Sequence, residues 1–239
     1  MKLLALDSSS IVATVALMEE DKLIGEIILN HRKNHSEKLV PIIHRLLEEV
    51  EMDIQEIDAF GVCIGPGSFT GIRIGVSTAK ALAQVGNKPL IGISTLEGLA
   101  FNLPYCKGII CPILDAQRNQ IYTGLYKWEG NQMYSIEKEQ AIGVEEWIEK
   151  IQDRNEHIHF VGDGVEKFIS FFQERLKDRV SVTPSTVKMP RASSIGALAM
   201  DKIQRGKITE YKEIVPNYIR KSQAEQNLKI KGEGNARRV

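Results

Sequence analysis

The chain of 239 residues carries 31 basic and 31 acidic side chains and is 43% hydrophobic and 26% charged. This balance excludes a uniformly basic protein that coats nucleic acid, and the length fits one large domain or two smaller ones. The three cysteines, Cys63, Cys106 and Cys111, form no C-x-x-C pair, which predicts buried, reduced thiols in a cytoplasmic protein. No run of roughly 18 apolar residues is present, so we expect no membrane span.

The first half of the chain predicts three strands followed by alternating helices and strands. The expected strands cover residues 3–6, 12–18, 23–29, 59–64 and 89–93, and the expected helices cover 37–50, 69–84 and 95–101. The first helix is indicated by apolar residues three and four positions apart, from Leu39 to Val50, and Ser36 is its expected N-cap. Periodicity alone leaves open whether this stripe faces the chain's own sheet or a partner.

The second half repeats this order. Strands are expected at 108–114, 120–126, 133–138, 158–161 and 180–182, and helices at 144–151, 165–176 and 192–204. The first strand of each half ends in Leu-Asp followed by a small residue, at Asp7 and at Asp115. The sequence therefore predicts an α/β fold of two ribonuclease H-like βββαβα halves, the two-lobed actin-like (ASKHA) architecture.

The expected domains are 1–104, 105–220 and a tail at 221–239. The first is an actin-like half that carries the dimerisation helices, and the second contains the last helix, a candidate to pack back on the first half. Residues 220–239 hold six basic and two acidic residues and no aromatic one. We expect a flexible basic tail, with RNA or partner contact as the alternative.

Two strand-end carboxylates are candidates for a nucleotide site in this architecture. Asp7 and Asp115 could contact Mg²⁺ or phosphate-bound water, with Ser8 beside the first. Gly162 and Gly164 form a turn comparable to one that often holds adenosine in actin-like proteins. Neither aspartate is followed by the glycine that lets backbone approach phosphate, so the competing interpretation is a turn or cap, and any nucleotide site is vestigial.

The glycine-rich stretch 65–75 is the most distinctive segment. It follows a strand and opens a helix, where anions can bind, but it matches neither G-x-x-x-x-G-K nor G-x-G-x-x-G. Gly71 and Gly75 are four residues apart and leave one helix face without side chains. We therefore favour close packing of another helix on this face over phosphate binding.

The sequence gives little support for a metal site or for a peptidase. His31 and His35 have a metal-ligand spacing, but no third ligand is evident nearby. Ser8 to Ser10 lie in no G-x-S-x-G elbow and have no identifiable base, which argues against a peptidase.

Together these segments resemble the TsaB (YeaZ) family. The matching stretches are 3–9, His35–Ser36–Glu37 with 39–41, 65–75, 114–118, Gly162–Asp163–Gly164 and Tyr218–Ile219–Arg220. The resemblance implies a non-catalytic subunit needed for N6-threonylcarbamoyladenosine at position 37 of ANN-reading tRNAs. It also implies a heterodimer with the catalytic paralogue TsaD, cooperation with the ATPase TsaE, self-association, and contact with tRNA through the complex.

The resemblance further implies that the two helices of the first half form the partner interface. The expected interface residues are His35, Leu39, Ile42, Ile43, Leu46, Phe69, Gly71, Ile72, Gly75, Val76 and Ala79. A charge at Gly75 or Val76 is then expected to abolish association and to leave the fold intact.

One comparison with TsaD bears on catalysis. TsaD binds its metal through H-x-x-x-H, and the matching positions here are Thr95 and Leu99. Leucine cannot bind a metal and threonine is a poor ligand, so the transfer site is expected to be missing. The alternative is an actin-like ATPase or kinase that uses Asp7 and Asp115. No cofactor is expected in the isolated chain, although ATP or ADP is a candidate at a complex interface.

Overall fold

The computed structural model describes residues 1–30 and 35–220, and the side chains of these except at 35 and 36. The first sheet has the order β3-β2-β1-β4-β5. Its strands are β1 (Lys2–Asp7), β2 (Val12–Glu19), β3 (Lys22–Asn30), β4 (Ala59–Gly65) and β5 (Leu90–Ser94). β1 pairs antiparallel with β2 and parallel with β4, as expected for a hairpin that feeds βαβ units.

The second sheet repeats this arrangement with the order β10-β9-β6-β7-β8. Its strands are β6 (Ile109–Asp115), β7 (Gln120–Glu129), β8 (Gln132–Gly143), β9 (Ile158–Val161) and β10 (Val180–Val182). β6 is the counterpart of β1, because it too lies between an antiparallel and a parallel neighbour. The two mixed sheets confirm the duplicated, actin-like fold class.

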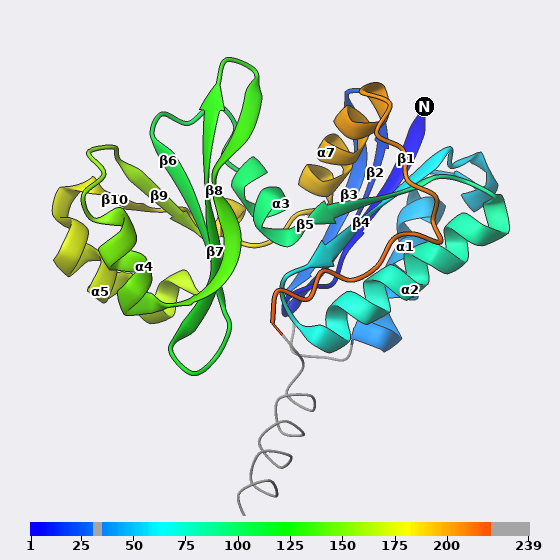
Figure 1. The fold of residues 1–239 in the computed structure, drawn as a ribbon. Helices are drawn as coiled ribbons and strands as arrows, with labels where there is room; N and C mark the ends of the chain where they lie inside the picture. Colours follow the sequence, from blue (N-terminus) through cyan, green and yellow to red (C-terminus); the bar gives the residue numbers. More distant parts are fainter. Residues whose placement is uncertain (31–34, 221–239) are drawn as a thin grey trace, which may run out of the picture.

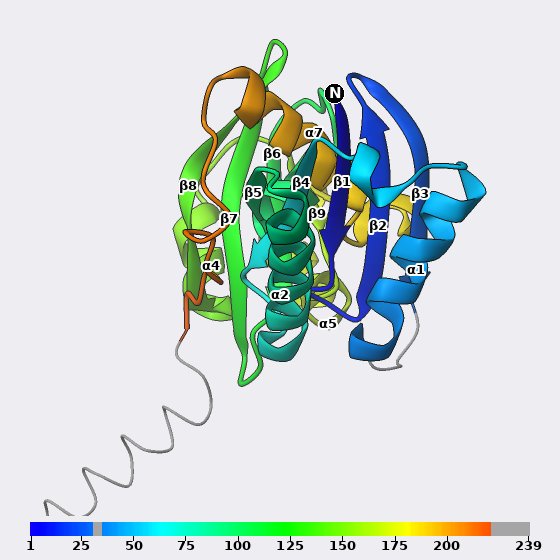
Figure 2. The same cartoon turned by 90° about the vertical axis from the view of Figure 1, so that its right-hand side faces the viewer.

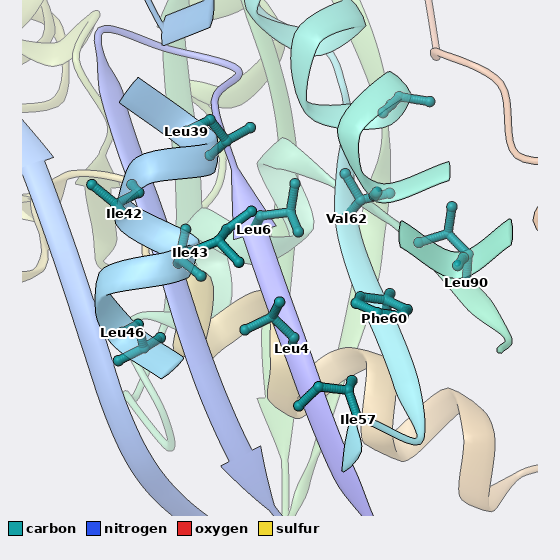
Figure 3. Close-up of a cluster of buried hydrophobic side chains, with 14 of the residues drawn as sticks. Leu4, Leu6, Leu39, Ile42, Ile43, Leu46, Ile57, Phe60, Val62 and Leu90 are labelled. Atoms are coloured by element: carbon teal, nitrogen blue, oxygen red, sulfur yellow. The ribbon is translucent and has the colours of Figure 1, made fainter. Parts of the chain in front are cut away.

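Helices cover both faces of the first sheet (Figures 1 and 2). One face carries α1 (His35–Glu49) and α2 (Phe69–Gly86), and the other carries α7 (Ala192–Gln204). The apolar stripe of α1 meets β1 and β4 in one core, drawn in Figure 3. Each large aliphatic side chain buried in this way contributes about 1.5–3 kcal/mol.

The helices of the second lobe are α4 (Val144–Ile151) and α5 (Val165–Leu176), which pack on one face of its sheet around Trp147 and Phe172. The other face receives α3 (Thr95–Phe101), which follows the last strand of the first sheet. Helix α3 thus joins the two lobes, because Leu96 and Leu99 share a cluster with residues of β6 and β7.

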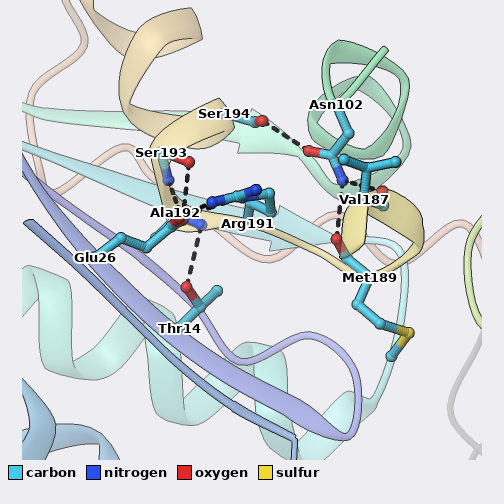
Figure 4. Close-up of polar contacts among 9 residues, drawn as sticks. All are labelled: Thr14, Glu26, Asn102, Val187, Met189, Arg191, Ala192, Ser193 and Ser194. Carbon is cyan, nitrogen blue, oxygen red and sulfur yellow. Dashed lines mark hydrogen bonds and ion pairs between the residues drawn. The ribbon is translucent and has the colours of Figure 1, made fainter. Parts of the chain in front are cut away.

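The chain returns to the first lobe after the second sheet, and the last helix packs back on the first half, the arrangement for which the sequence analysis named it a candidate. Helix α7 packs on β1, β2, β4 and β5, and the stretch after it crosses the first lobe in extended form (Figure 1). The anchor is Glu26 of β3, whose buried carboxylate pairs with Arg191 and accepts the Ser193 N–H at 2.9 Å (Figure 4). A carboxylate is favourable at a helix N-terminus.

The expected elements all occur, with small differences at their ends. The β7–β8 hairpin is longer than the apolar pattern indicates, since half-exposed residues extend both strands. The sequence analysis missed three short helices, Ile54–Glu56 (η1), Lys177–Arg179 (η2) and α6 (Ser185–Lys188). One turn is too short to show helical periodicity. The Ser36 cap lies outside the described side chains.

The cysteines are free, as predicted, but only two of the three are buried, because Cys106 is half-exposed. Burial raises the pKa of the Cys111 thiol to about 12 and that of Cys63 well above its ordinary value. Among the described helices, none is long and apolar enough to cross a bilayer.

Candidate functional site

A cavity of about 520 Å³ lies where the two lobes meet. Five segments line it: the β1–β2 turn, the start of α2, the end of β6 with the β6–β7 turn and β7, the β9–α5 turn, and the end of the described chain. The lining residues are Ser9, Ser10, Ile11, Pro66, Gly67, Ser68, Phe69, Ile72, Leu114, Asp115, Ala116, Gln117, Tyr122, Asp163, Asn217, Tyr218, Ile219 and Arg220. The topology thus brings the ends of both first strands to one cavity, as the duplicated pattern predicts.

Asp7 is buried beneath this cavity. Its side chain is almost wholly covered, and its Oδ1 accepts the backbone N–H of Ser9 at 2.7 Å. This contact is an Asx turn, the structural role that competed with metal binding in the sequence analysis. Asp7 itself does not line the cavity.

The start of α2 is occupied by the chain's own β1–β2 turn. Ser68 donates its backbone N–H to the carbonyl of Ser9 at 2.6 Å and caps the helix through the N–H of Gly71. The hydroxyl of Ser8 donates to the Gly71 carbonyl at 2.9 Å. Because donors that would face a phosphate at a helix N-terminus already bond protein oxygens, this turn is a poor phosphate cradle.

The glycine face of α2 packs on this same turn and not on another helix, which corrects our expectation. A Cβ at Gly71 would lie 2.0 Å from the Ser8 carbonyl oxygen, and one at Gly75 would lie 2.6 Å from the Ser8 hydroxyl oxygen. Both distances are shorter than real carbon contacts. The glycines therefore permit a loop to approach a helix, a contact between segments that spacing along one helix cannot identify.

Asp115 differs from Asp7 because it is partly exposed and paired. Both of its carboxylate oxygens lie 3.1 Å from the ammonium of Lys167 on α5, and Oδ1 accepts the N–H of Gln117 at 2.9 Å. The structure thus places one candidate carboxylate under the cavity and the other on its wall, and the second already has a cation.

The turn at Gly162 and Gly164 packs against the end of β6. A Cβ at Gly162 would lie 2.3 Å from the carbonyl oxygen of Ile113, and one at Gly164 would lie 2.8 Å from the backbone nitrogen of Asp115. Close packing against β6 therefore explains why glycine is needed at both positions, without a bound adenosine. Between them, Asp163 lines the cavity, and burial raises the pKa of its carboxyl.

The end of the described chain closes one side of the cavity, a feature that the sequence analysis did not predict. Tyr218 stacks on Phe69 of α2 with ring centroids 4.5 Å apart and accepts a hydrogen bond from Nε of Arg73 at 2.8 Å. The Arg73 guanidinium also lies 4.0 Å from the centre of the Phe69 ring. The i, i+4 spacing of Phe69 and Arg73 was a local signal for this pair, but nothing local indicated Tyr218.

Most of the expected interface residues are buried within the first lobe. The buried ones are Leu39, Ile42, Ile43, Leu46, Gly71, Ile72, Gly75, Val76 and Ala79. Phe69 is half-exposed and stacks on Tyr218, and the side chain of His35 lies outside the described part. The apolar stripe therefore faces the chain's own sheet. A charge at Gly75 or Val76 would disturb the fold, so neither position is a clean probe of association.

The exposed face of the same two helices carries a different set of residues. On α2 this face is formed by Thr70, Ser77, Ala81, Gln84 and Val85, and on the adjacent α1 by Val40, Pro41 and His44. We call these eight residues the outer face. Val85 is 90% exposed and Val40 is 57% exposed. Charged side chains border the outer face: Arg73 is exposed between Thr70 and Ser77 on α2, and Glu48 lies 3.9 Å from His44 on α1.

The two positions compared with metal-binding histidines are in the core. Thr95 is buried with its hydroxyl 2.8 Å from the Cys63 sulfur, and Leu99 is buried between the lobes. Within residues 1–30 and 35–220, no group of three potential ligands could hold a metal ion. The candidate ligand His31 lies outside these residues.

Comparisons with known proteins identify relatives of this chain in sequence and in fold. The family model for TsaD, tRNA N6-adenosine threonylcarbamoyltransferase, matches residues 22–228. The chain is 33% identical to the tRNA threonylcarbamoyladenosine biosynthesis protein TsaB of Bacillus subtilis, across 94% of this chain and 96% of that one. It is 26% identical to the Escherichia coli protein of the same name, across 95% and 98%. YeaZ from Pseudomonas aeruginosa has a similar structure, with a TM-score of 0.76 at 24% identity, covering 91% of this chain and 99% of that one.

Proposed function

Because the chain belongs to the TsaB (YeaZ) family of threonylcarbamoyladenosine biosynthesis proteins, we propose that it is a non-catalytic subunit of the modifying complex. In this role it binds and activates a TsaD-type catalytic subunit, together with a TsaE-type ATPase. The product is N6-threonylcarbamoyladenosine at adenosine 37 of ANN-reading tRNAs, which the chain contacts through the complex. We place this work in the cytoplasm.

The absence of histidine at positions 95 and 99 carries the non-catalytic part of this proposal. Threonylcarbamoyl transfer in TsaD depends on a metal held by two histidines one helical turn apart. Here the matching side chains are a buried threonine bonded to Cys63 and a buried leucine between the lobes. This helix supports packing between the lobes in place of metal binding.

The outer face is the surface we assign to partners. It lies on the two helices that the resemblance implicates and combines exposed aliphatic with small uncharged side chains, which permits close approach of another helix. One such surface could serve a second copy of this chain or a TsaD-type subunit. The buried stripe beneath it holds the helices in place.

Reconstitution of the reaction from purified proteins tests the proposal. The TsaD-type subunit, the TsaE-type ATPase and an ANN-reading tRNA are supplied with an activated threonylcarbamoyl donor, with and without this chain. We expect product only when the chain is present, and loss of product when the histidines of the TsaD-type subunit are replaced. Full activity without this chain would contradict the proposal.

An actin-like ATPase or kinase that uses Asp7 and Asp115 remains the alternative function. Its geometry is less favourable, because Asp7 is buried in an Asx turn and Asp115 is paired with Lys167. Isothermal titration of the isolated chain with Mg-ATP separates the two functions. Saturable binding that Asp115→Asn abolishes would favour the alternative. A nucleotide held only at a complex interface would bind the mixture with the TsaD-type subunit and not the chain alone.

A further inference from the structure

The two lobes are joined by α3 and by two segments beside it. One leads from α3 into β6 of the second lobe, and the other leads from α6 back to α7 on the first lobe. Asn102 ends α3 and ties these segments together, because its Nδ2 donates to the carbonyls of Val187 and Met189, each at 2.8 Å (Figure 4). Its Oδ1 accepts the hydroxyl of Ser194 at 2.7 Å. This buried side chain therefore fixes the outgoing and returning segments at a single point between the lobes.

One side of the cavity is closed by a strap, which we define as residues 214–220. Ile214 is 7% exposed and belongs to the core of the first lobe, and Lys80 of α2 donates to its carbonyl at 2.9 Å. Farther along, Asn217 donates its N–H to the Ile64 carbonyl at 2.7 Å. The strap is thus fixed to the first lobe by core packing and backbone bonds.

The last described residue crosses from the first lobe to the second. Arg220 donates from Nη1 to the carbonyl of Ala116, at the β6–β7 turn, at 2.7 Å. Two residues earlier, Tyr218 is held on α2 by the stack with Phe69 and the bond from Arg73. A segment anchored in the first lobe therefore also binds the second lobe at the wall of the cavity.

We propose that the strap is a latch that holds the two lobes closed over the cavity, with Asn102 at the hinge and Arg220 as the residue that engages the second lobe. The arrangement has the parts of a hinged closure: a fixed side, an opening side and a bond that spans the opening. An arginine hydrogen bond of this kind shifts an equilibrium by roughly tenfold or more when it is removed. Loss of Arg220 should therefore populate an open form.

The distance between spin labels on the two lobes tests this proposal in the chain alone. Labels are placed at exposed helical positions outside the outer face, Glu49→Cys on α1 and Glu174→Cys on α5, with half-exposed Cys106 replaced by serine and the buried thiols retained. The labelled chain is diluted into excess unlabelled chain, so that only distances within one copy are measured. The parent should give one narrow distance distribution. Arg220→Gln should add a second, longer distance, with the open-to-closed ratio raised roughly tenfold or more.

A second strap variant and a control variant complete the test of the latch. Tyr218→Ala should shift the distribution in the same direction, because it frees the strap from Phe69 and Arg73. Arg205→Ala removes an arginine that bonds Asp201 within α7 and should leave the distribution unchanged. Circular dichroism establishes that each variant is folded. Distributions for Arg220→Gln and Tyr218→Ala that match the parent would overturn the latch, whether or not the chain binds a TsaD-type subunit.

Discussion

At the scale of single residues, contacts between Ser8 and the start of α2 decide what the cavity can hold. The Ser9 carbonyl and the Ser8 hydroxyl approach backbone that would otherwise be open to a ligand. This approach is possible only because Gly71 has no side chain, as a Cβ there would lie 2.0 Å from the Ser8 carbonyl oxygen. The same atoms that close the phosphate position therefore hold β1 and α2 together.

Gly71→Ala should destabilise the protein by about 1–3 kcal/mol or more, because the new methyl group meets backbone that cannot rotate away. Gly86→Ala in the same helix is the matched control. A Cβ there would meet only the flexible Lys88 side chain, and alanine favours helix, so its stability should be equal or slightly higher. Urea unfolding measures both. Equal losses from the two variants would contradict the packing role of Gly71.

Asp163→Asn should stabilise the protein at pH 7. Burial raises the pKa of Asp163, so the folded state binds this proton more tightly than the unfolded chain does. Stability from such a group is present below the ordinary aspartate pKa of about 3.9 and is lost as pH rises through the higher folded-state pKa. The variant should thus gain stability at pH 7 and little at about pH 3.5.

Urea unfolding at the two pH values measures this gain. Asp153→Asn, at an exposed position of the same lobe, is the control. A gain for Asp163→Asn that is equal at both pH values, or a loss confined to pH 7, would be inconsistent with a raised pKa.

The roles of individual residues were the hardest feature to predict from the sequence. Asp7 and Asp115 were correctly identified as strand ends, because a buried apolar run followed by a carboxylate is a local pattern. Their different surroundings depend on Ser9 and Lys167, and the lysine lies 52 residues from its partner. Spacing showed that Gly71 and Gly75 share a face, but only the tertiary fold shows that a loop covers it.

At the scale of secondary-structure elements, α2 has two distinct faces. Its inner face carries the glycines and the core residues Ile72, Val76 and Ala79, and its outer face carries small or uncharged side chains. Helix periodicity predicted the existence of two faces, since buried residues recur three and four positions apart. Which face is left exposed could be decided only once the position of the sheet was known.

Ala81→Arg should weaken association with the TsaD-type subunit and with a second copy by tenfold or more, because a charge would be desolvated in the interface (~1.4 kcal/mol). The fold should be unchanged, since Ala81 is exposed. Gln173→Arg, at an exposed position on α5 of the other lobe, is the matched control. Sedimentation measures association, and wild-type affinity for Ala81→Arg would exclude this face.

Glu26→Gln tests how α7 is held on the first sheet. The buried Glu26 side chain pairs with Arg191 and accepts both the N–H and the hydroxyl of Ser193. Replacing the carboxylate by an amide should cost about 1–3 kcal/mol in the free energy of unfolding, because charge-assisted hydrogen bonds are lost. Glu48→Gln on the exposed surface of α1 should have no measurable effect. Equal urea midpoints for both variants would show that α7 does not need this anchor.

Most elements could be predicted because their signals are local. The stripe from Leu39 to Leu47 indicates α1, and β-branched runs such as Val12 to Val15 indicate strands. The end of β8 was missed because its outer half is partly exposed and lacks a clear alternation. The short helices after Asp53 and Pro184 depend on caps and turns within a single helical turn.

At the scale of the whole molecule, two lobes are joined at α3 and bridged again by the end of the described chain. Duplication predicted the two lobes and made the last helix a candidate to pack back on the first, but no sequence pattern predicted the path of 205–220. That path depends on bonds such as Arg73 to Tyr218, between residues 145 positions apart. Long-range contacts of this kind follow from the fold as a whole, which is why the path of 205–220 across the first lobe was not predicted.

Sedimentation velocity of the chain alone, then mixed with the TsaD-type protein of the same source, tests whether this chain is a partner subunit. We expect a self-dimer that converts to a one-to-one heterodimer at micromolar concentrations, because both partners use the outer face of α1 and α2. If the two proteins sediment independently at tens of micromolar, with tRNA, nucleotide and the TsaE-type ATPase also present, this chain is not the partner subunit we propose.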